Sequence, residues 1–303
     1  MKTMKAILML ATVCLPMLIG AFPLGVSADS FHTPKKYYLA LGDSAAFGFQ
    51  LEKFDDEVKA TGTEDPTTFN TGYVDDFAAR LAVIDPGIQT VNMSCPGYGG
   101  SSTGFLDYCR FYVLNGFALH YNYTGSQLNA AITFLQAHPG QVSPVTIGIG
   151  LGDLEPFYAG CKFKSACIFA GLPAVLETFK TNFTKILTEL RAAAPDSEIL
   201  VMQNYNPDAL KHPFTNDVIL ALNHVIGDVA RLVDARLVDM YPVFNGTLLG
   251  PQPVTLCALL AVCAPPLFDI HPTDYGYEVM AEVFWAASGY EEFNSRADED
   301  ASR

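Results

Sequence analysis

The sequence predicts an α/β protein with a central parallel sheet and helices on both faces of that sheet. Five short runs are rich in β-branched residues and almost continuously apolar, as strands covered on both faces are. Segments with helical apolar spacing lie between these runs, and such an alternation favours a parallel sheet. No internal repeat and no Pro/Ser-rich linker divides the chain, so we expect one domain after the N-terminal segment.

The five predicted strands share a short length and a continuous apolar character. In chain order they are Tyr37–Leu41, Gln89–Met93, Val145–Ile149, Glu198–Met202 and Arg236–Met240. Because apolar and polar residues do not alternate within these runs, neither face of the sheet is expected to meet water.

Apolar residues recur at helical spacing in five further segments. These predicted helices are Tyr73–Val83, Gln127–Ala137, Leu172–Ala193, Asn216–Val233 and Asp274–Ala287. Ser126 is a typical N-cap for the second of these helices, and Pro195 ends the third. Two long stretches, Gly104–Gly125 and Gly246–Phe268, show no periodicity, and loops of this length in compact domains are usually functional.

The N-terminus has the pattern of a secretory signal peptide. Lys2 and Lys5 precede an apolar stretch that ends in Val26-Ser27-Ala28, a small-residue cleavage site. An uncleaved membrane anchor is the alternative, because the stretch could just span a bilayer, but Pro16 and Pro23 interrupt it. We therefore predict a secreted protein with a signal peptide over 1–28, one domain over 29–291 and a polar flexible tail over 292–303.

Six cysteines remain after Cys14 leaves with the signal peptide. An even number of cysteines in an exported chain indicates disulfides, and these six fall into three local couples. A zinc site is the alternative, but the sequence has no C-x-x-C and no histidine at ligand spacing. We expect the disulfides Cys95–Cys109, Cys161–Cys167 and Cys257–Cys263.

The composition excludes several classes of function. With 50% hydrophobic and 17% charged residues, the chain is not intrinsically disordered. The net charge is −14, from 32 acidic and 18 basic residues, and a nucleic-acid partner requires clustered Lys and Arg instead. The sequence contains no phosphate-binding P-loop, and we expect neither a cofactor nor a metal.

A serine and a histidine at opposite ends of the chain are candidates for nucleophilic catalysis. The first predicted strand runs directly into Gly42-Asp43-Ser44, which places Ser44 beyond the carboxyl end of a strand, where ligands bind in open parallel sheets. A serine nucleophile needs a base, and His271 lies on a predicted loop before the last helix. Either signal alone is weak, but together they indicate a serine hydrolase.

Four blocks of the chain carry a more specific signal. They are Tyr37–Ser44, Val91–Gly97, Val145–Asp153 and Asp269–Thr273 followed by Gly276-Tyr277. In this order they resemble the four blocks of the GDSL, or SGNH, family of serine esterases and lipases, over nearly all of the predicted mature chain. The resemblance implies a three-layer α/β/α, flavodoxin-like fold, which agrees with the strand and helix pattern above.

The resemblance also implies roles for individual residues, with two departures from the family pattern. Ser44 is the implied nucleophile and His271 its base, and the N–H groups of Ser44 and Gly97 belong to the oxyanion hole. The family commonly has Asp three residues before the histidine, where this chain has Phe268. Asp269 could orient His271 instead, because residues two apart in an extended loop point the same way. A backbone carbonyl is the alternative.

The second departure concerns the third oxyanion donor. The family has an asparagine at the position of Gly152, which has no side chain to donate. Loss of one such donor typically lowers turnover about 10²–10³-fold. Either Asn204 or Asn206 replaces it, or backbone N–H groups alone form the hole, or activity is low. If the pocket has room, Gly152→Asn is expected to raise kcat about tenfold or more.

A second serine competes for the role of nucleophile. Gly100-Ser101-Ser102-Thr103-Gly104 matches the G-x-S-x-G nucleophile elbow. However, an elbow needs a strand directly before the serine and a helix directly after it. The second predicted strand ends near Met93, and a glycine-rich stretch intervenes. We expect Ser102 to belong to a structural loop.

These observations predict a secreted serine esterase or lipase that cleaves carboxylic esters through an acyl-enzyme on Ser44. The aromatic stretch Gly104–Gly125 favours apolar acyl groups and a small-molecule or lipid-like substrate. A carbohydrate acetyl-esterase is one alternative, and a binding protein that has lost activity through Gly152 is another. We expect a monomer without a stable membrane span after cleavage.

Overall fold

The computed structural model describes residues 33–246, 252–264 and 268–290. The predicted signal peptide and the polar tail lie outside the described residues. Within the described ranges, no helix is both long enough and apolar enough to cross a membrane.

The sheet has five strands, all parallel, as predicted. In sheet order they are β2 (Gln89–Asn92), β1 (Tyr37–Gly42), β3 (Val142–Gly148), β4 (Ile199–Gln203) and β5 (Arg236–Asp239). This is the flavodoxin-like order, in which the chain reverses its direction across the sheet between β1 and β3. β3 begins three residues earlier than predicted, and its register with β1 shifts around Pro144, a residue that cannot donate to a strand ladder.

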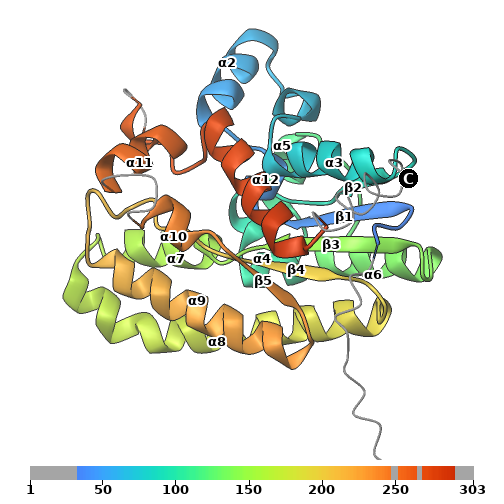
Figure 1. Cartoon of the computed structure of the whole chain (residues 1–303). Coiled ribbons are helices and arrows are strands. Elements are labelled where there is room, and N and C mark those ends of the chain that lie inside the picture. The colour runs from blue at the N-terminus through green and yellow to red at the C-terminus, as the bar shows by residue number, and fades with distance from the viewer. Residues whose placement is uncertain (1–32, 247–251, 265–267, 291–303) are drawn as a thin grey trace, which may run out of the picture. The chain divides into compact units, whose positions relative to one another are not determined.

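Helices cover both faces of the sheet and complete the three layers (Figure 1). One face carries α3 (Tyr73–Ile84) and α12 (Asp274–Ser288), which pack against each other. The other face carries α6 (Gln127–Ala137), α8 (Ser165–Ala193) and α9 (Thr215–Leu232). The predicted α/β/α fold is therefore confirmed.

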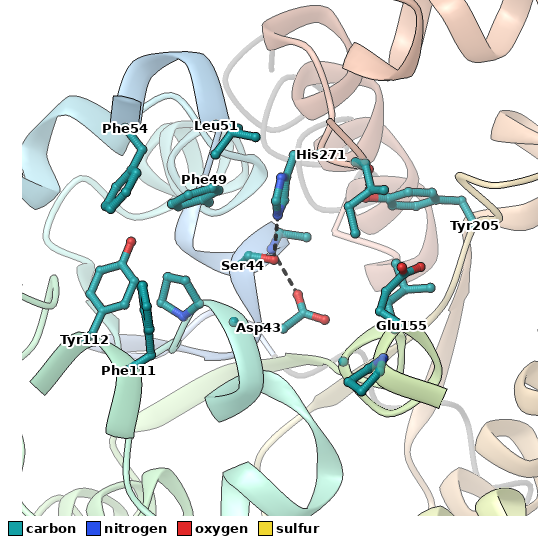
Figure 2. A pocket seen from close by; sticks show the side chains of 17 residues that line it. Asp43, Ser44, Phe49, Leu51, Phe54, Phe111, Tyr112, Glu155, Tyr205 and His271 are labelled. Atoms are coloured by element: carbon teal, nitrogen blue, oxygen red, sulfur yellow. Dashed lines mark hydrogen bonds between the residues drawn. The ribbon is translucent and has the colours of Figure 1, made fainter. Parts of the chain in front are cut away.

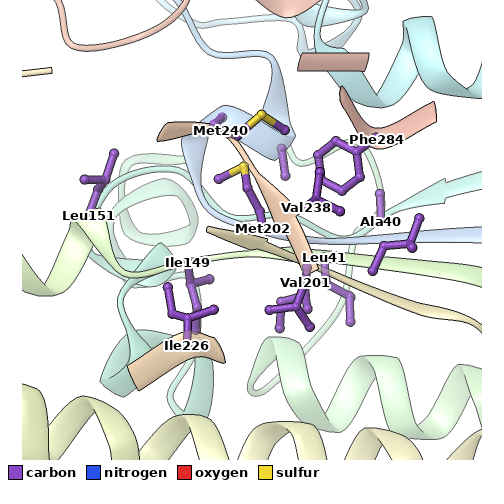
Figure 3. Packing of buried hydrophobic residues seen from close by; sticks show 14 of the residues in the cluster. Ala40, Leu41, Ile149, Leu151, Val201, Met202, Ile226, Val238, Met240 and Phe284 are labelled. Atoms are coloured by element: carbon purple, nitrogen blue, oxygen red, sulfur yellow. The ribbon is translucent and has the colours of Figure 1, made fainter. Parts of the chain in front are cut away.

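Successive strand residues enter the two different cores (Figure 3). Ala40, Met202 and Val238 lie on the side of Phe284, which belongs to α12. Their neighbours Leu41 and Val201 lie on the opposite side, toward Ile226 of α9. All of these side chains are fully buried or nearly so. Burial on both faces is the physical reason why the strand sequences do not alternate.

The third predicted helix is longer than expected. α8 begins at Ser165 rather than Leu172 and continues through Pro173. A proline inside a helix removes one backbone hydrogen bond. Ile168 and Leu172 are nevertheless buried against the core, and their burial extends the apolar face past the proline.

Several helices were not predicted, and most lie at the carboxyl edge of the sheet. The longer ones are α2 (Leu51–Thr61), α7 (Leu151–Gly160) and α11 (Gln252–Leu259). The short ones are α1 (Ser44–Phe47), α4 (Ser102–Leu106), α5 (Arg110–Asn115) and α10 (Tyr241–Phe244). The two stretches without periodicity thus contain α5 and α11, although part of the second stretch lies outside the described residues.

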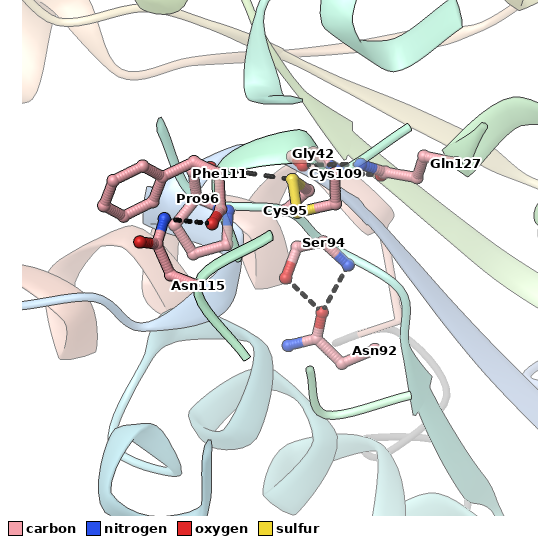
Figure 4. The surroundings of a disulfide bond; sticks show 9 residues. All are labelled: Gly42, Asn92, Ser94, Cys95, Pro96, Cys109, Phe111, Asn115 and Gln127. Atoms are coloured by element: carbon pink, nitrogen blue, oxygen red, sulfur yellow. Dashed lines mark hydrogen bonds between the residues drawn. A yellow bond between two sulfur atoms is a disulfide. The ribbon is translucent and has the colours of Figure 1, made fainter. Parts of the chain in front are cut away.

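Three disulfides join the cysteines in the predicted local pairs, Cys95–Cys109, Cys161–Cys167 and Cys257–Cys263. The first pair links the segment after β2 to the start of α5 (Figure 4). In the same region the side chain of the buried Gln127 exchanges two hydrogen bonds with the backbone of Gly42, at 2.7 and 3.0 Å. These links fix the loops that follow β1 and β2.

Candidate active site

Ser44 lies at the carboxyl edge of the sheet, at the point where the chain turns from β1 into α1. Asp43 caps this helix, because its Oδ1 accepts a hydrogen bond from the Ala45 N–H at 2.9 Å. Ser44 is the first residue of α1, so its N–H lies in the first turn, where a helix leaves N–H groups without an internal partner. The neighbouring strand β3 marks the switch point of the sheet, the usual ligand site in this topology.

A chain of hydrogen bonds joins Ser44, His271 and Asp269. Ser44 Oγ lies 2.8 Å from His271 Nε2 (Figure 2). On the other side of the imidazole, His271 Nδ1 lies 2.5 Å from Asp269 Oδ1. Residues 227 positions apart in the sequence therefore meet, because the loop before α12 reaches the end of β1. Asp269 and His271 are two residues apart, and both side chains point to the same side of the loop.

Asp269 has a second partner that the sequence did not reveal. Its Oδ2 accepts a hydrogen bond from the Leu51 N–H at 2.8 Å, at the beginning of α2. Burial raises the pKa of Asp269, but the hydrogen bond from His271, the imidazole charge and the Leu51 N–H outweigh burial, so this pKa lies below its ordinary value. Asp269 is consequently a carboxylate at neutral pH.

The pKa of Asp43, beside the serine, is shifted in the opposite direction to that of Asp269. Asp43 is only 5% exposed. Burial raises the pKa of Asp43 to about 7, although the hydrogen bond from the Ala45 N–H opposes the shift. Asp43 and Asp269 are thus two carboxyl groups of one site that differ in charge state over the mildly acidic range.

Ser44 and His271 open into a cavity of about 400 Å³ with two different walls. Figure 2 shows Phe49, Phe54, Phe111 and Tyr112 on one side of Ser44. Glu155 and Tyr205 lie on the other side. The first wall is apolar and aromatic, whereas the second brings a carboxyl group into the cavity.

Three backbone N–H groups border the cavity around Ser44. They belong to the lining residues Ser44, Gly97 and Gly152. Ser44 and Gly152 lie in the first turns of α1 and α7, where N–H groups have no partner inside the helix, and the structure shows no acceptor for any of the three N–H groups among the described residues. Gly97 has φ +71°, a backbone conformation that glycine adopts without strain. This arrangement suits an oxyanion.

The structure leaves no room for a side chain at Gly152, which contradicts the expected gain from Gly152→Asn. A Cβ atom there would lie 2.9 Å from Ser101 N and 3.2 Å from Gly100 C. These are backbone atoms of the segment that follows Gly97, so an asparagine would displace that segment. The glycine in this turn that requires a positive φ is Gly150, at +130°.

We expect Gly152→Asn to lower kcat/KM for a p-nitrophenyl ester about tenfold or more and to lower the melting temperature, because the displaced segment directly follows Gly97 and would shift its N–H group. Gly160→Asn is the matched control: it lies at the end of the same helix, and a Cβ there meets no atom within 4 Å. Kinetics and thermal unfolding of both variants test this. If Gly152→Asn were as fast as the wild type, the backbone of Gly100 and Ser101 would be able to move aside without disturbing the site.

The two asparagines proposed as replacement donors are engaged elsewhere. Asn204 Nδ2 donates to Ile149 O at 3.0 Å, and Asn206 Nδ2 donates to Thr215 Oγ1 and Asn216 Oδ1. Both asparagines are fully buried, and neither lines the cavity. Their amides hold the loop after β4 rather than reach the serine.

Ser102, the competing nucleophile, is also engaged. It is fully buried, and its Oγ donates to Asp153 Oδ1 at 2.6 Å while its N–H donates to Asp153 Oδ2 at 2.7 Å. Asn182 contacts the same hydroxyl at 3.2 Å. A helix follows Ser102, but the η2 turn (Gly97–Gly100) rather than a strand precedes it. Ser102 therefore ties α4 to α7.

The described residues contain no group of three or more His, Cys, Asp or Glu side chains that could hold a metal ion. Sequence reasoning missed several cavity residues, among them Phe49, Leu51, Phe54, Glu155 and Tyr205. The spacing of Leu51, Phe54 and Val58 is a weak helical signal that could have located α2, whereas nothing in the sequence points to Glu155.

Comparison with known proteins gives a family and a fold. The sequence model of the GDSL-like lipase/acylhydrolase family matches residues 40–279. No curated protein sequence matches the chain.

Similar solved structures include an extracellular lipase from Streptomyces rimosus, with a TM-score of 0.55, 18% identity and coverage of 83% of this chain and 99% of that chain. Phospholipase A1 from Streptomyces albidoflavus NA297 has a TM-score of 0.55, 18% identity and coverage of 84% and 99%. The acetylxylan esterase Axe2 from Geobacillus stearothermophilus has a TM-score of 0.54, 17% identity and coverage of 84% and 95%. These likenesses agree with the three-layer fold described above.

Proposed function

The chain belongs to the GDSL-like lipase/acylhydrolase family, and from this premise we propose that it hydrolyses carboxylic esters through an acyl-enzyme on Ser44. The observation that carries the proposal is the continuous hydrogen-bonded chain from Ser44 Oγ through His271 to Asp269, which opens into a cavity. A serine becomes a nucleophile when a base within hydrogen-bond reach takes its proton and a third group orients that base.

In the proposed reaction, His271 Nε2 accepts the proton of Ser44 as Oγ attacks the ester carbonyl carbon. Asp269, a carboxylate, holds Nδ1–H and stabilises the imidazolium that forms. His271 then returns the proton to the leaving alcohol. Water, deprotonated by the same imidazole, attacks the acyl-enzyme and releases the acid, which restores Ser44.

The backbone N–H groups of Ser44, Gly97 and Gly152 are the proposed oxyanion donors. Fixed donors stabilise the charge that develops on the carbonyl oxygen without reorganisation during the reaction. Because Gly152 stands at the start of α7, its N–H also benefits from the positive end of the helix dipole. In this proposal, the backbone N–H of Gly152 replaces the absent asparagine side chain as the third oxyanion donor.

The aromatic wall of the cavity supports an apolar acyl group as the substrate. Each methylene buried there contributes about 0.8 kcal/mol, or about fourfold in kcat/KM when the contact is made in the transition state. We expect kcat/KM to rise about tenfold or more from p-nitrophenyl acetate to p-nitrophenyl butyrate. Initial rates over a series of chain lengths measure this directly. An optimum at acetate would favour the carbohydrate acetyl-esterase alternative instead.

We also propose that the protein acts outside the cell. The three disulfides form readily only in oxidising compartments. This agrees with the signal-peptide pattern of the first 28 residues.

A further inference from the structure

In the second wall of the cavity, the carboxyl group of Glu155 on α7 interacts with a second carboxyl group, that of Asp208 in the loop after β4. Glu155 lines the cavity, whereas Asp208 does not line it and is only 2% exposed. The two carboxyl groups are close enough to interact, and each shifts the pKa of the other. Neither group has a role in the proposed triad or oxyanion hole.

Two carboxyl groups in proximity can form a hydrogen bond only if they share one proton, because two carboxylates only accept. Among the described residues, no N–H or O–H donor contacts Glu155 Oε1 or Asp208 Oδ2, although both atoms are buried. The fold therefore keeps one acid protonated, as in other pairs of close carboxyl groups.

The surroundings place that proton on Glu155. Burial, followed by the charge of Asp208, raises the pKa of Glu155 above its ordinary value. Burial also raises the pKa of Asp208, but the hydrogen bond with Glu155 and the charges of His212 and Lys211 oppose that shift. Glu155 then donates its proton to Asp208, and its carbonyl-type oxygen stays available as an uncharged acceptor.

The position of Glu155 decides which part of an ester it meets. It lies across Ser44 from the aromatic wall (Figure 2). The acyl and alcohol parts of an ester leave the carbonyl carbon in different directions. With the acyl chain against the aromatic residues, the alcohol part lies toward Glu155 and Tyr205.

We propose that Glu155 recognises the alcohol part of the substrate by accepting a hydrogen bond from a free hydroxyl group, so that the preferred substrates are esters of polyols. This inference rests on the proposed esterase function and names the substrate class for the same site. Asp208 is a positioning residue that holds Glu155 through the shared proton.

Two butyrate esters that differ in the alcohol part test the proposal: glyceryl monobutyrate, which has free hydroxyls, and propyl butyrate, which has none. We expect the ratio of their kcat/KM values to favour the glyceryl ester about fivefold or more in the wild type. Glu155→Gln should keep the ratio, because its amide donates to Asp208 and its carbonyl accepts from the substrate. Glu155→Leu should bring the ratio near one.

Glu177→Leu, on the exposed side of α8, is the control for removal of a carboxyl group and should keep the wild-type ratio. A wild-type ratio near one, or a ratio that Glu155→Leu leaves unchanged, overturns the proposal. If Glu155→Gln loses the preference as fully as Glu155→Leu, a negative charge is recognised and the proposal also fails. Failure of the esterase function itself would look different, since the wild type would hydrolyse neither ester.

Discussion

Replacement of Ser44 by alanine is expected to lower kcat/KM for p-nitrophenyl butyrate by about 10⁴-fold or more. Without Oγ no acyl-enzyme forms, and the remaining oxyanion donors give only slow attack by water. Among the described residues, the side chain of Ser44 hydrogen-bonds to His271 only, so the fold is expected to stay intact. Steady-state kinetics and thermal unfolding of the purified variant measure both effects.

Ser102→Ala is the matched control for this experiment. Ser102 is buried and donates to Asp153, so its loss is expected to lower the melting temperature and to leave most of the activity. If Ser102→Ala were inactive while Ser44→Ala kept its activity, the nucleophile would be Ser102.

Replacement of Asp269 by asparagine is expected to lower kcat by about 10³–10⁴-fold with a much smaller change in KM. The asparagine has nearly the same shape, but its NH₂ group does not accept the Nδ1–H of His271 and favours the wrong imidazole tautomer. One side-chain oxygen also has to serve both His271 and the Leu51 N–H, which now contact different oxygens.

Asp274→Asn, five residues further on, controls for loss of a nearby charge. Asp274 is exposed and contacts Lys53 and Gln50 on the surface. We expect this variant to stay within about threefold of the wild-type kcat, since surface ion pairs of this kind contribute little. If Asp269→Asn kept more than a tenth of the wild-type kcat, a backbone carbonyl would be the group that orients His271.

The strands could be predicted from the sequence because burial on both faces produces continuous apolar runs. Val201 and Met202 enter opposite cores, and both positions must therefore be apolar. The local disulfides could be predicted for a similar reason, since cysteines six or fourteen residues apart close short loops. The candidate triad residues came from motifs at the ends of the chain, and the parallel topology explains why those ends meet.

α2 was not predicted, because none of its residues is completely buried and its few apolar residues form only a weak helical pattern. The space around Gly152 is a second example. From the sequence alone, the glycine indicates only the loss of an oxyanion donor. The fold shows that a Cβ atom at Gly152 would lie too close to the backbone of Ser101.

The interaction between Glu155 and Asp208 could not be predicted from the sequence, for a different reason. The two residues lie 53 positions apart on different elements, and only the folded sheet edge brings them together. Their sequence neighbours show no pattern that distinguishes them from solvated surface acids.

Ser44 is the proposed activated nucleophile of this chain. The most direct measurement is reaction of the purified protein with a fluorophosphonate probe, followed by mass spectrometry of its proteolytic peptides. We predict a single adduct on the peptide that contains Ser44, and none in the Ser44→Ala variant. An adduct on the peptide that contains Ser102, or no adduct in a folded protein that hydrolyses esters, would contradict this proposal.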